Sequence, residues 1–131
     1  MIIGYGRSRI GIKEIKELTI ISENKFLDKW FSEIEQERIF GESSSYDKHD
    51  ELIACYWNIK VATLIALGYS QNNHSVNYQD IEVSHDRSGN YNIQLHKDLK
   101  KLVGDLQVKK VRIKFNRLEN IVEANVELNV R

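Results

Sequence analysis

Apolar residues in the first half of the chain recur at the spacing of buried helix faces. Between residues 23 and 39 they form the stripe of an amphipathic helix, made of Phe26, Leu27, Trp30, Phe31 and Ile34. Ser22 is the predicted N-cap of this helix, and Glu23 is expected in its first turn. From residue 47 to residue 67 apolar residues occupy nearly every side, which predicts a long helix buried in the core. Gly68 follows it as the predicted C-cap.

The beginning and the second half of the chain carry strand patterns. Apolar and polar residues alternate over residues 78–85, 91–95 and 111–130, as they do in half-buried strands. Residues 2–6 read as a further strand that leads into the polar segment 7–9, and residues 99–106 as a short helix. The pattern predicts one α+β domain over residues 1–131, with helices packed on an antiparallel sheet.

The composition narrows the classes of protein that fit. Nineteen basic and nineteen acidic residues leave no net charge, which argues against a general binder of nucleic acid or of anionic membranes. One cysteine, Cys55, excludes an internal disulfide and fits a reducing compartment. No apolar run reaches the ~20 residues that span a bilayer, and the N-terminus does not resemble a signal peptide. We therefore expect a cytoplasmic protein without nucleic-acid or membrane partners.

Residues 50–68, DELIACYWNIKVATLIALG, are followed by DIEV at 80–83 and a turn at Gly89. This arrangement resembles the holo-acyl-carrier-protein synthases, the small single-domain 4′-phosphopantetheinyl transferases. Their central helix reads A-x-x-x-A-x-K-E-A-x-x-K-A-L-G and their next strand D-I-E-V, and they have G-I-G where this chain has Gly4, Tyr5 and Gly6. The resemblance implies their fold, an antiparallel sheet packed on a long central helix. It also implies a homotrimer with active sites between neighbouring subunits.

The same resemblance implies an activity, the transfer of the phosphopantetheine arm of coenzyme A to a serine of an acyl carrier protein with Mg²⁺ as cofactor. Two carboxylates hold the metal in the family, and they fall on Ser8 and Val61 in this chain. The family motif K-E-A-x-x-K has two lysines. The first is present here as Lys60, whereas the second falls on Ile65. A hydroxyl and an alkyl group cannot replace two carboxylates as Mg²⁺ ligands, so no catalytic and no metal-binding residue is predicted.

Four side chains remain candidates for ligand contacts: Tyr5, Arg7, Arg9 and Lys60. Two arginines at the family's metal position could bind an anion without a cation, or they could belong to a solvated or subunit-facing segment. Lys60 could contact a phosphate, or it could extend to the surface. Tyr56 and Trp57 are predicted to fill core space, and Cys55 to be buried and unreactive. The four histidines lack metal-ligand spacing and are predicted to lie at the surface.

Three functions stay open at the level of sequence. The first is a protein that has lost phosphopantetheinyl transfer and serves as a non-catalytic or repurposed trimeric partner in fatty-acid or polyketide-type biosynthesis. The second is a divergent but active transferase that uses coenzyme A and Mg²⁺ and modifies an acyl carrier protein. The third is a new enzyme activity in the cleft between subunits. The sequence alone leaves open whether the protein is an enzyme.

Overall fold

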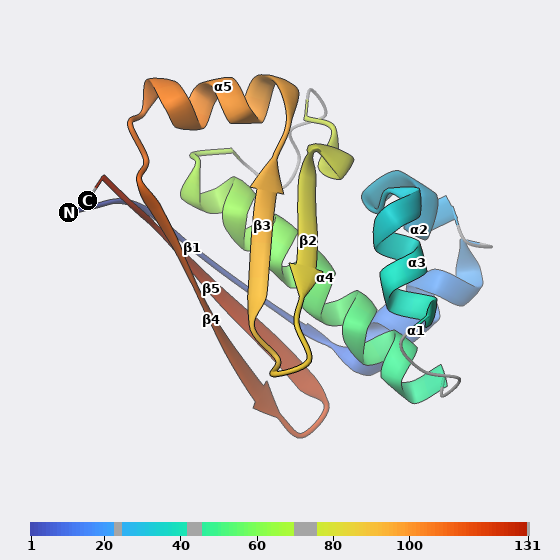
Figure 1. Ribbon diagram of the computed structural model, residues 1–131. Coiled ribbons are helices and arrows are strands. Elements are labelled where there is room, and N and C mark those ends of the chain that lie inside the picture. Colours follow the sequence, from blue (N-terminus) through green and yellow to red (C-terminus); the bar gives the residue numbers. More distant parts are fainter. Residues whose placement is uncertain (23–24, 42–45, 70–75, 131) are drawn as a thin grey trace.

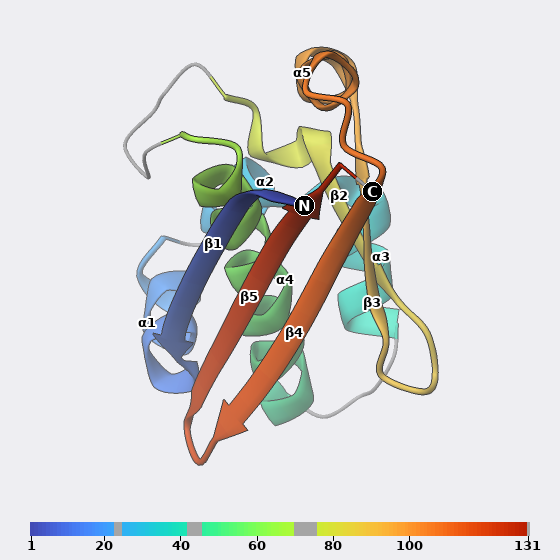
Figure 2. The same ribbon diagram turned by 90° about the vertical axis from the view of Figure 1, so that its left-hand side faces the viewer.

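The computed structural model describes residues 1–22, 25–41, 46–69 and 76–130. One long helix, α4, lies between a three-stranded antiparallel sheet and a two-stranded hairpin (Figures 1 and 2). The elements in chain order are β1 (Ile2–Gly11), α1 (Ile12–Ile21), α2 (Lys25–Trp30), α3 (Glu33–Gly41), α4 (Tyr46–Ala66), the 3₁₀ turn η1 (Tyr78–Asp80), β2 (Ile81–His85), β3 (Tyr91–Leu95), α5 (Lys97–Asp105), β4 (Lys110–Leu118) and β5 (Ile121–Asn129). The predicted α+β class and the antiparallel sheet on a central helix are confirmed.

The three-stranded sheet has the order β1-β5-β4, and its inner face covers α4 (Figure 2). Alternate residues of β5 point inward and are fully buried, namely Val122, Ala124, Val126 and Leu128. The hairpin β2–β3 packs on another side of α4, where Val83 joins the same core. Because α4 is covered from several sides, its apolar residues need no single stripe, as the sequence predicted. No helix within the described ranges is long and apolar enough to cross a membrane.

Two glycines let β1 lie directly against α4. A Cβ atom on Gly4 would stand 2.2 Å from the carbonyl oxygen of Ala66, and one on Gly6 would stand 1.8 Å from that of Ala62. Neither distance is possible for real atoms, so any side chain at these positions would push the strand off the helix. The glycines of the G-x-G segment therefore serve close packing between strand and helix.

The structure corrects three details of the sequence prediction. The helix predicted over residues 23–39 is two helices, α2 and α3, with a break at Phe31 and Ser32. At this break the Ser32 hydroxyl accepts a hydrogen bond from the Glu35 N–H, and the Ser32 N–H donates to the Glu35 carboxylate, which is a capping box. The polar segment 7–9 belongs to β1, and helix α1 was not predicted.

The predicted helix ends agree better with the structure. Gly68 has φ +92°, and the N–H groups of Gly68 and Tyr69 donate to the carbonyls of Ile65 and Leu64. This left-handed glycine ends α4 as the sequence predicted. The Ser22 hydroxyl accepts from the N–H of Phe26 in α2. Glu23, expected in the first turn of that helix, lies outside the described residues.

Candidate functional site

Ser8 and Asn58 form a buried hydrogen-bonded pair where β1 meets α4. The Ser8 hydroxyl donates to Asn58 Oδ1 at 2.8 Å, and Asn58 Nδ2 donates to the carbonyl of Val122 at 2.9 Å. Ser8 is 6% exposed and Asn58 is fully buried. Val61, which aligns with the second metal-binding carboxylate of the resembled family, lies less than one turn further along α4 and is also buried. The two positions thus lie on adjoining elements.

The side chains at this place do not fit a protein-bound Mg²⁺. Mg²⁺ prefers carboxylates among its oxygen ligands, and Ser8, Asn58 and Val61 supply a hydroxyl, an amide and an alkyl group. Glu123 adjoins the residue that pairs with Ser8, but it lies on the opposite face of the sheet. Within the described ranges, no group of three or more histidine, cysteine, aspartate or glutamate side chains is arranged to hold a metal ion.

Tyr5, Arg7 and Arg9 lie on the outer face of β1, because side chains of a strand alternate between its faces. Arg7 Nη2 donates to the Glu123 carboxylate at 2.8 Å, Arg9 Nε lies 3.9 Å from the same carboxylate, and the Tyr5 hydroxyl donates to Asn125 Oδ1 at 2.6 Å. The hydrogen bond from Arg7 lowers the pKa of Glu123. The structure does not bring these arginines together with Ser8, and a ligand contact by them stays a prediction for the outer sheet face.

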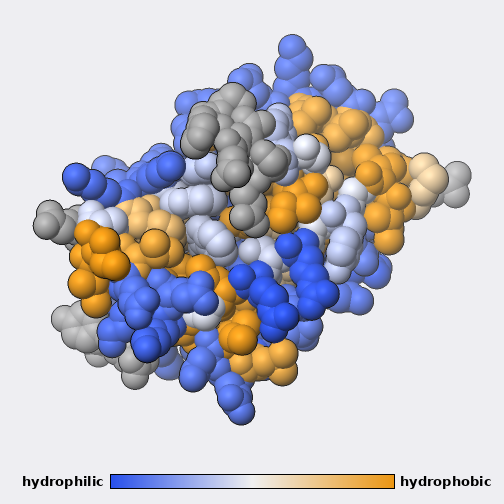
Figure 3. Space-filling model, turned by 180° about the vertical axis from the view of Figure 1, so that it is seen from behind, coloured by the Kyte–Doolittle hydropathy of each residue, from blue (hydrophilic) through white to orange (hydrophobic). Residues whose placement is uncertain are grey.

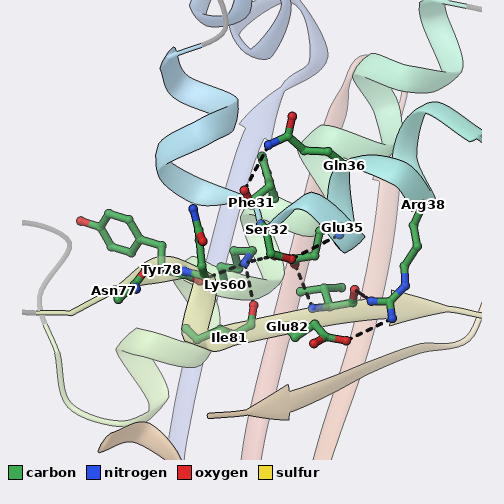
Figure 4. Close-up of polar contacts among 12 residues, drawn as sticks. Phe31, Ser32, Glu35, Gln36, Arg38, Lys60, Asn77, Tyr78, Ile81 and Glu82 are labelled. Carbon is green, nitrogen blue, oxygen red and sulfur yellow. Dashed lines mark hydrogen bonds and ion pairs between the residues drawn. The ribbon is translucent and has the colours of Figure 1, made fainter. Parts of the chain in front are cut away.

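Lys60 is fully buried, and its ammonium lies among groups of α3, η1 and β2 (Figure 4). Its ammonium donates to Glu35 Oε1 at 2.8 Å, to the carbonyl of Tyr78 at 2.9 Å and to that of Ile81 at 2.6 Å. An ammonium has three donor hydrogens, so these acceptors use all of them. Lys60 and Glu35 are fully buried. The expected surface position of Lys60 is therefore wrong, whereas a phosphate contact by Lys60 stays an untested prediction.

The buried pair joins three elements that are distant in sequence. Glu35 of α3 also accepts from the N–H of Val83 in β2, at 3.0 Å. Lys60 therefore ties α4 to α3 directly and to the start of β2 through Ile81. Burial lowers the pKa of Lys60 to about 8, against the opposing effect of Glu35.

A cavity of about 240 Å³ opens between the N-terminal half of α4 and the β2–β3 hairpin. Its lining includes Lys48 and Leu52 from α4, His85 and Tyr91 from the two strands, and Asp86 and Arg87 from the turn between them. The volume is below the usual range for a complete ligand of drug size. The cavity can therefore take only one part of a larger molecule.

Two cations, Lys48 and Arg87, and two carboxylates, Glu51 and Asp86, line the cavity. Asp86 accepts hydrogen bonds from the N–H groups of Ser88 and Asn90, and those from Asn90 are the main cause of its lowered pKa. Glu51, also at the cavity, is paired with Arg117. Lys48 and Arg87 have no ion-pair partner within the part of the chain that the structure describes. These two side chains can donate to an anionic group such as a phosphate.

An aromatic layer forms the inner side of this cavity. The Tyr56 hydroxyl and His85 Nδ1 are 2.6 Å apart in a hydrogen bond, and Tyr91 stacks on Phe115. Tyr56 fills the core as predicted, whereas His85 is half-buried and not a simple surface residue. Burial raises the pKa of the Cys55 thiol to about 12, which agrees with the predicted unreactive cysteine.

Sequence reasoning missed this cavity, since its residues come from three segments that only the fold brings together. A basic residue at the start of the long helix and another in the hairpin turn were the available signal. Neither residue type is unusual at a helix start or in a turn, so the signal becomes specific only once the hairpin is placed beside α4.

The chain is a small α+β domain whose first strand packs on the central helix through two glycines. Over 116 residues the chain is 30% identical to the holo-[acyl-carrier-protein] synthase of Alkaliphilus oremlandii, covering 88% of this chain and 89% of that protein. No protein-family model matches the sequence. At this identity and coverage, the chain belongs to the holo-acyl-carrier-protein synthase family.

Solved structures agree with this fold. The synthase of Neisseria meningitidis superimposes with a TM-score of 0.83 at 20% identity, covering 98% of this chain and 99% of that one. The synthase of Helicobacter pylori in complex with coenzyme A gives a TM-score of 0.76 at 18% identity, covering 95% and 99% of the two chains. These likenesses confirm the fold that the sequence resemblance implied.

Proposed function

We propose that this protein is a 4′-phosphopantetheinyl transferase of the holo-acyl-carrier-protein synthase type, which binds coenzyme A and modifies an acyl carrier protein. Its relationship to the Alkaliphilus oremlandii synthase over most of both chains carries this proposal. Residues 1–131 act as one domain in it. Coenzyme A as substrate and the lone buried Cys55 favour the cytoplasm as its location.

Lys48 and Arg87 at the cavity support coenzyme A as the ligand. Coenzyme A carries several phosphates, and related synthases have been solved with coenzyme A or with its 3′,5′-ADP part. Lys48 and Arg87 would contact one phosphate group, while Leu52 and Tyr91 offer apolar surface beside it. Since the cavity holds only part of the ligand, the remainder lies across the surface or against a neighbouring subunit.

Charge removal at the cavity tests this assignment. A hydrogen bond to a charged group is worth about 1.5–3 kcal/mol, so Lys48→Ala and Arg87→Ala are each expected to weaken coenzyme A binding by about tenfold or more. Lys100→Ala is the matched control, because Lys100 is an exposed lysine of α5. Calorimetric titration measures all three. Equal affinity of the cavity variants and the control would place coenzyme A elsewhere.

Assembly and partner belong to the same proposal. Apolar side chains remain exposed on β1 and α1, namely Ile2, Ile3, Leu18, Ile20 and Ile21, and Figure 3 shows apolar patches among the polar residues of the rear face. Such patches are typical of contact surfaces. A homotrimer and a docked acyl carrier protein would cover them. Light scattering coupled to size-exclusion chromatography gives the oligomeric state, and a monomer would refute the trimer.

A second candidate function is favoured by one observation, the neutral Ser8–Asn58 pair at the position where the family holds its metal. In this alternative the protein no longer transfers phosphopantetheine and serves as a non-catalytic partner of carrier-protein-dependent biosynthesis. Incubation with an apo acyl carrier protein, coenzyme A and Mg²⁺, followed by intact-mass measurement of the carrier, separates the two.

The mass of the carrier decides between the candidates. A gain of one phosphopantetheine arm supports the transferase. No gain, with a known synthase active in the same preparation, refutes transfer to that carrier and favours the second candidate if coenzyme A still binds. No gain and no coenzyme A binding would refute the proposed transferase altogether.

A further inference from the structure

Ser8, Asn58 and Val61 stand where the family fold implies a divalent metal ion. We infer that this protein has replaced the metal by the Ser8–Asn58 hydrogen bond, so that it neither binds Mg²⁺ at this place nor needs Mg²⁺ to hold its phosphate-bearing ligand. The second half of this inference rests on the proposed coenzyme A binding, and the first half does not.

The hydrogen-bond network fixes the orientation of the Asn58 amide. The carbonyl of Val122 can only accept, so the amide group that faces it at 2.9 Å must be the NH₂. The amide oxygen of Asn58 then faces Ser8 and accepts its hydroxyl hydrogen at 2.8 Å. The two neutral oxygens at this place are thus already joined to each other in one chain of bonds from β1 through α4 to β5.

Space and charge also oppose a metal ion here. Mg²⁺ keeps several of its waters when it binds to proteins, and a hydrated ion needs room beside the strand. At the neighbouring Gly6, however, β1 lies so close to α4 that even a Cβ atom would stand 1.8 Å from a backbone oxygen. Val61 fills its own position with an alkyl group and is 2% exposed. A double positive charge among these buried neutral groups would be uncompensated.

The positive charge that the ligand needs comes from elsewhere in this chain. Lys48 and Arg87 line the cavity between α4 and the hairpin, and the carboxylates beside them are held by Arg117 and by backbone N–H groups. These positive groups belong to the chain itself and do not depend on a dissociable ion. Phosphate binding at this cavity is therefore expected to be unaffected by chelators.

A titration with Mn²⁺, whose binding is measured by electron paramagnetic resonance, tests the first half of the inference, that no divalent metal binds at this place. The wild-type protein is compared with Ser8→Asp/Val61→Glu and with the neutral control Ser8→Asn/Val61→Gln, which has the same shape. We expect no site tighter than about 1 mM in the wild type and the control, and a tighter site in the acidic variant. A stoichiometric wild-type site below about 100 µM overturns the inference. Equally tight binding by both double variants overturns it as well, because it would show a metal site that needs no carboxylate.

Circular dichroism shows whether each double variant is folded, and the wild-type titration decides alone if the acidic variant is not. The ligand half is tested by calorimetry of coenzyme A with wild-type protein, in EDTA and in Mg²⁺. Affinities equal within about twofold support the inference, and a loss of about tenfold in EDTA overturns it. Failure of coenzyme A to bind in either buffer refutes the proposed function instead, and the Mn²⁺ titration still decides the metal site.

Discussion

Replacing Lys60 by methionine removes the positive half of the buried ion pair while keeping a side chain of similar length. The Glu35 carboxylate would then remain fully buried without its counter-charge, although it still accepts from the N–H groups of Ser32 and Val83. The carbonyls of Tyr78 and Ile81 would lose a donor as well. The variant therefore combines an unpaired buried charge with two backbone acceptors that lack this partner.

The expected loss follows from these contacts. Breaking a buried ion pair on one side typically costs about 3–5 kcal/mol, a large share of the roughly 5–15 kcal/mol that stabilise a domain. Lys60→Met is expected to lose stability in this range. Adding Glu35→Gln removes the unpaired buried charge. The double variant should therefore lose less stability than the two single variants lose in sum. The coupling between the two positions is expected to be about 1–3 kcal/mol.

Urea denaturation followed by tryptophan fluorescence measures each free energy of unfolding. Lys100→Met on the exposed side of α5 is the matched control and should stay within about 0.5 kcal/mol of wild type. A loss below about 1 kcal/mol for Lys60→Met would refute the buried pair. Wild-type stability combined with lost coenzyme A binding would show that the lysine contacts the ligand after all.

Three further predictions concern packing and pH. Gly6→Ala should cost about 1–3 kcal/mol of stability or more, because its Cβ would meet the Ala62 carbonyl, whereas Gly104→Ala meets nothing within 4 Å and should not destabilise α5. The Lys60 pKa of about 8 lies below its ordinary 10.5, so between these values the unfolded chain binds more protons than the folded protein. The free energy of unfolding, measured by urea titrations, should therefore rise from pH 8 to 9 by at most about 1.4 kcal/mol. The Cys55 pKa is raised from 9.0 to about 12, so above pH 9 the folded state keeps a proton that the unfolded state loses, and stability falls. In line with this, a thiol reagent at pH 9 should modify Cys55 only after urea is added.

The long helix and its end were predictable because several local signals agree there. Apolar residues on nearly all sides can be buried only in a helix that is covered from several directions, and Gly68 can adopt the left-handed conformation that ends it. The break between α2 and α3 was missed, although Ser32 and Glu35 have the spacing of a capping box. The continuous apolar stripe across the break concealed it.

The role of Lys60 could not be read from sequence, because its partner Glu35 is 25 residues away and its other acceptors are backbone carbonyls. Every residue has a backbone carbonyl, so the sequence does not indicate which carbonyls will accept a hydrogen bond from Lys60. The faces of β1 were predictable in principle, since side chains alternate along a strand. Treating residues 7–9 as a polar segment outside the strand led to the expectation that Arg7, Ser8 and Arg9 share one site.

The contacts that hold this fold are separate from those that a metal would use. Gly4 and Gly6 set the distance between β1 and α4 through backbone packing. Lys60 projects from another side of α4 and ties this helix to α3 and β2. Neither arrangement needs a charge at Ser8 or Val61. Neutral residues at these two positions are therefore compatible with the scaffold. The Ser8–Asn58 hydrogen bond links β1 to α4 at a place where two carboxylates would repel each other without a cation. On this reasoning, restoring both acids should lower stability in EDTA and recover it in Mn²⁺, which thermal unfolding in the two buffers would measure.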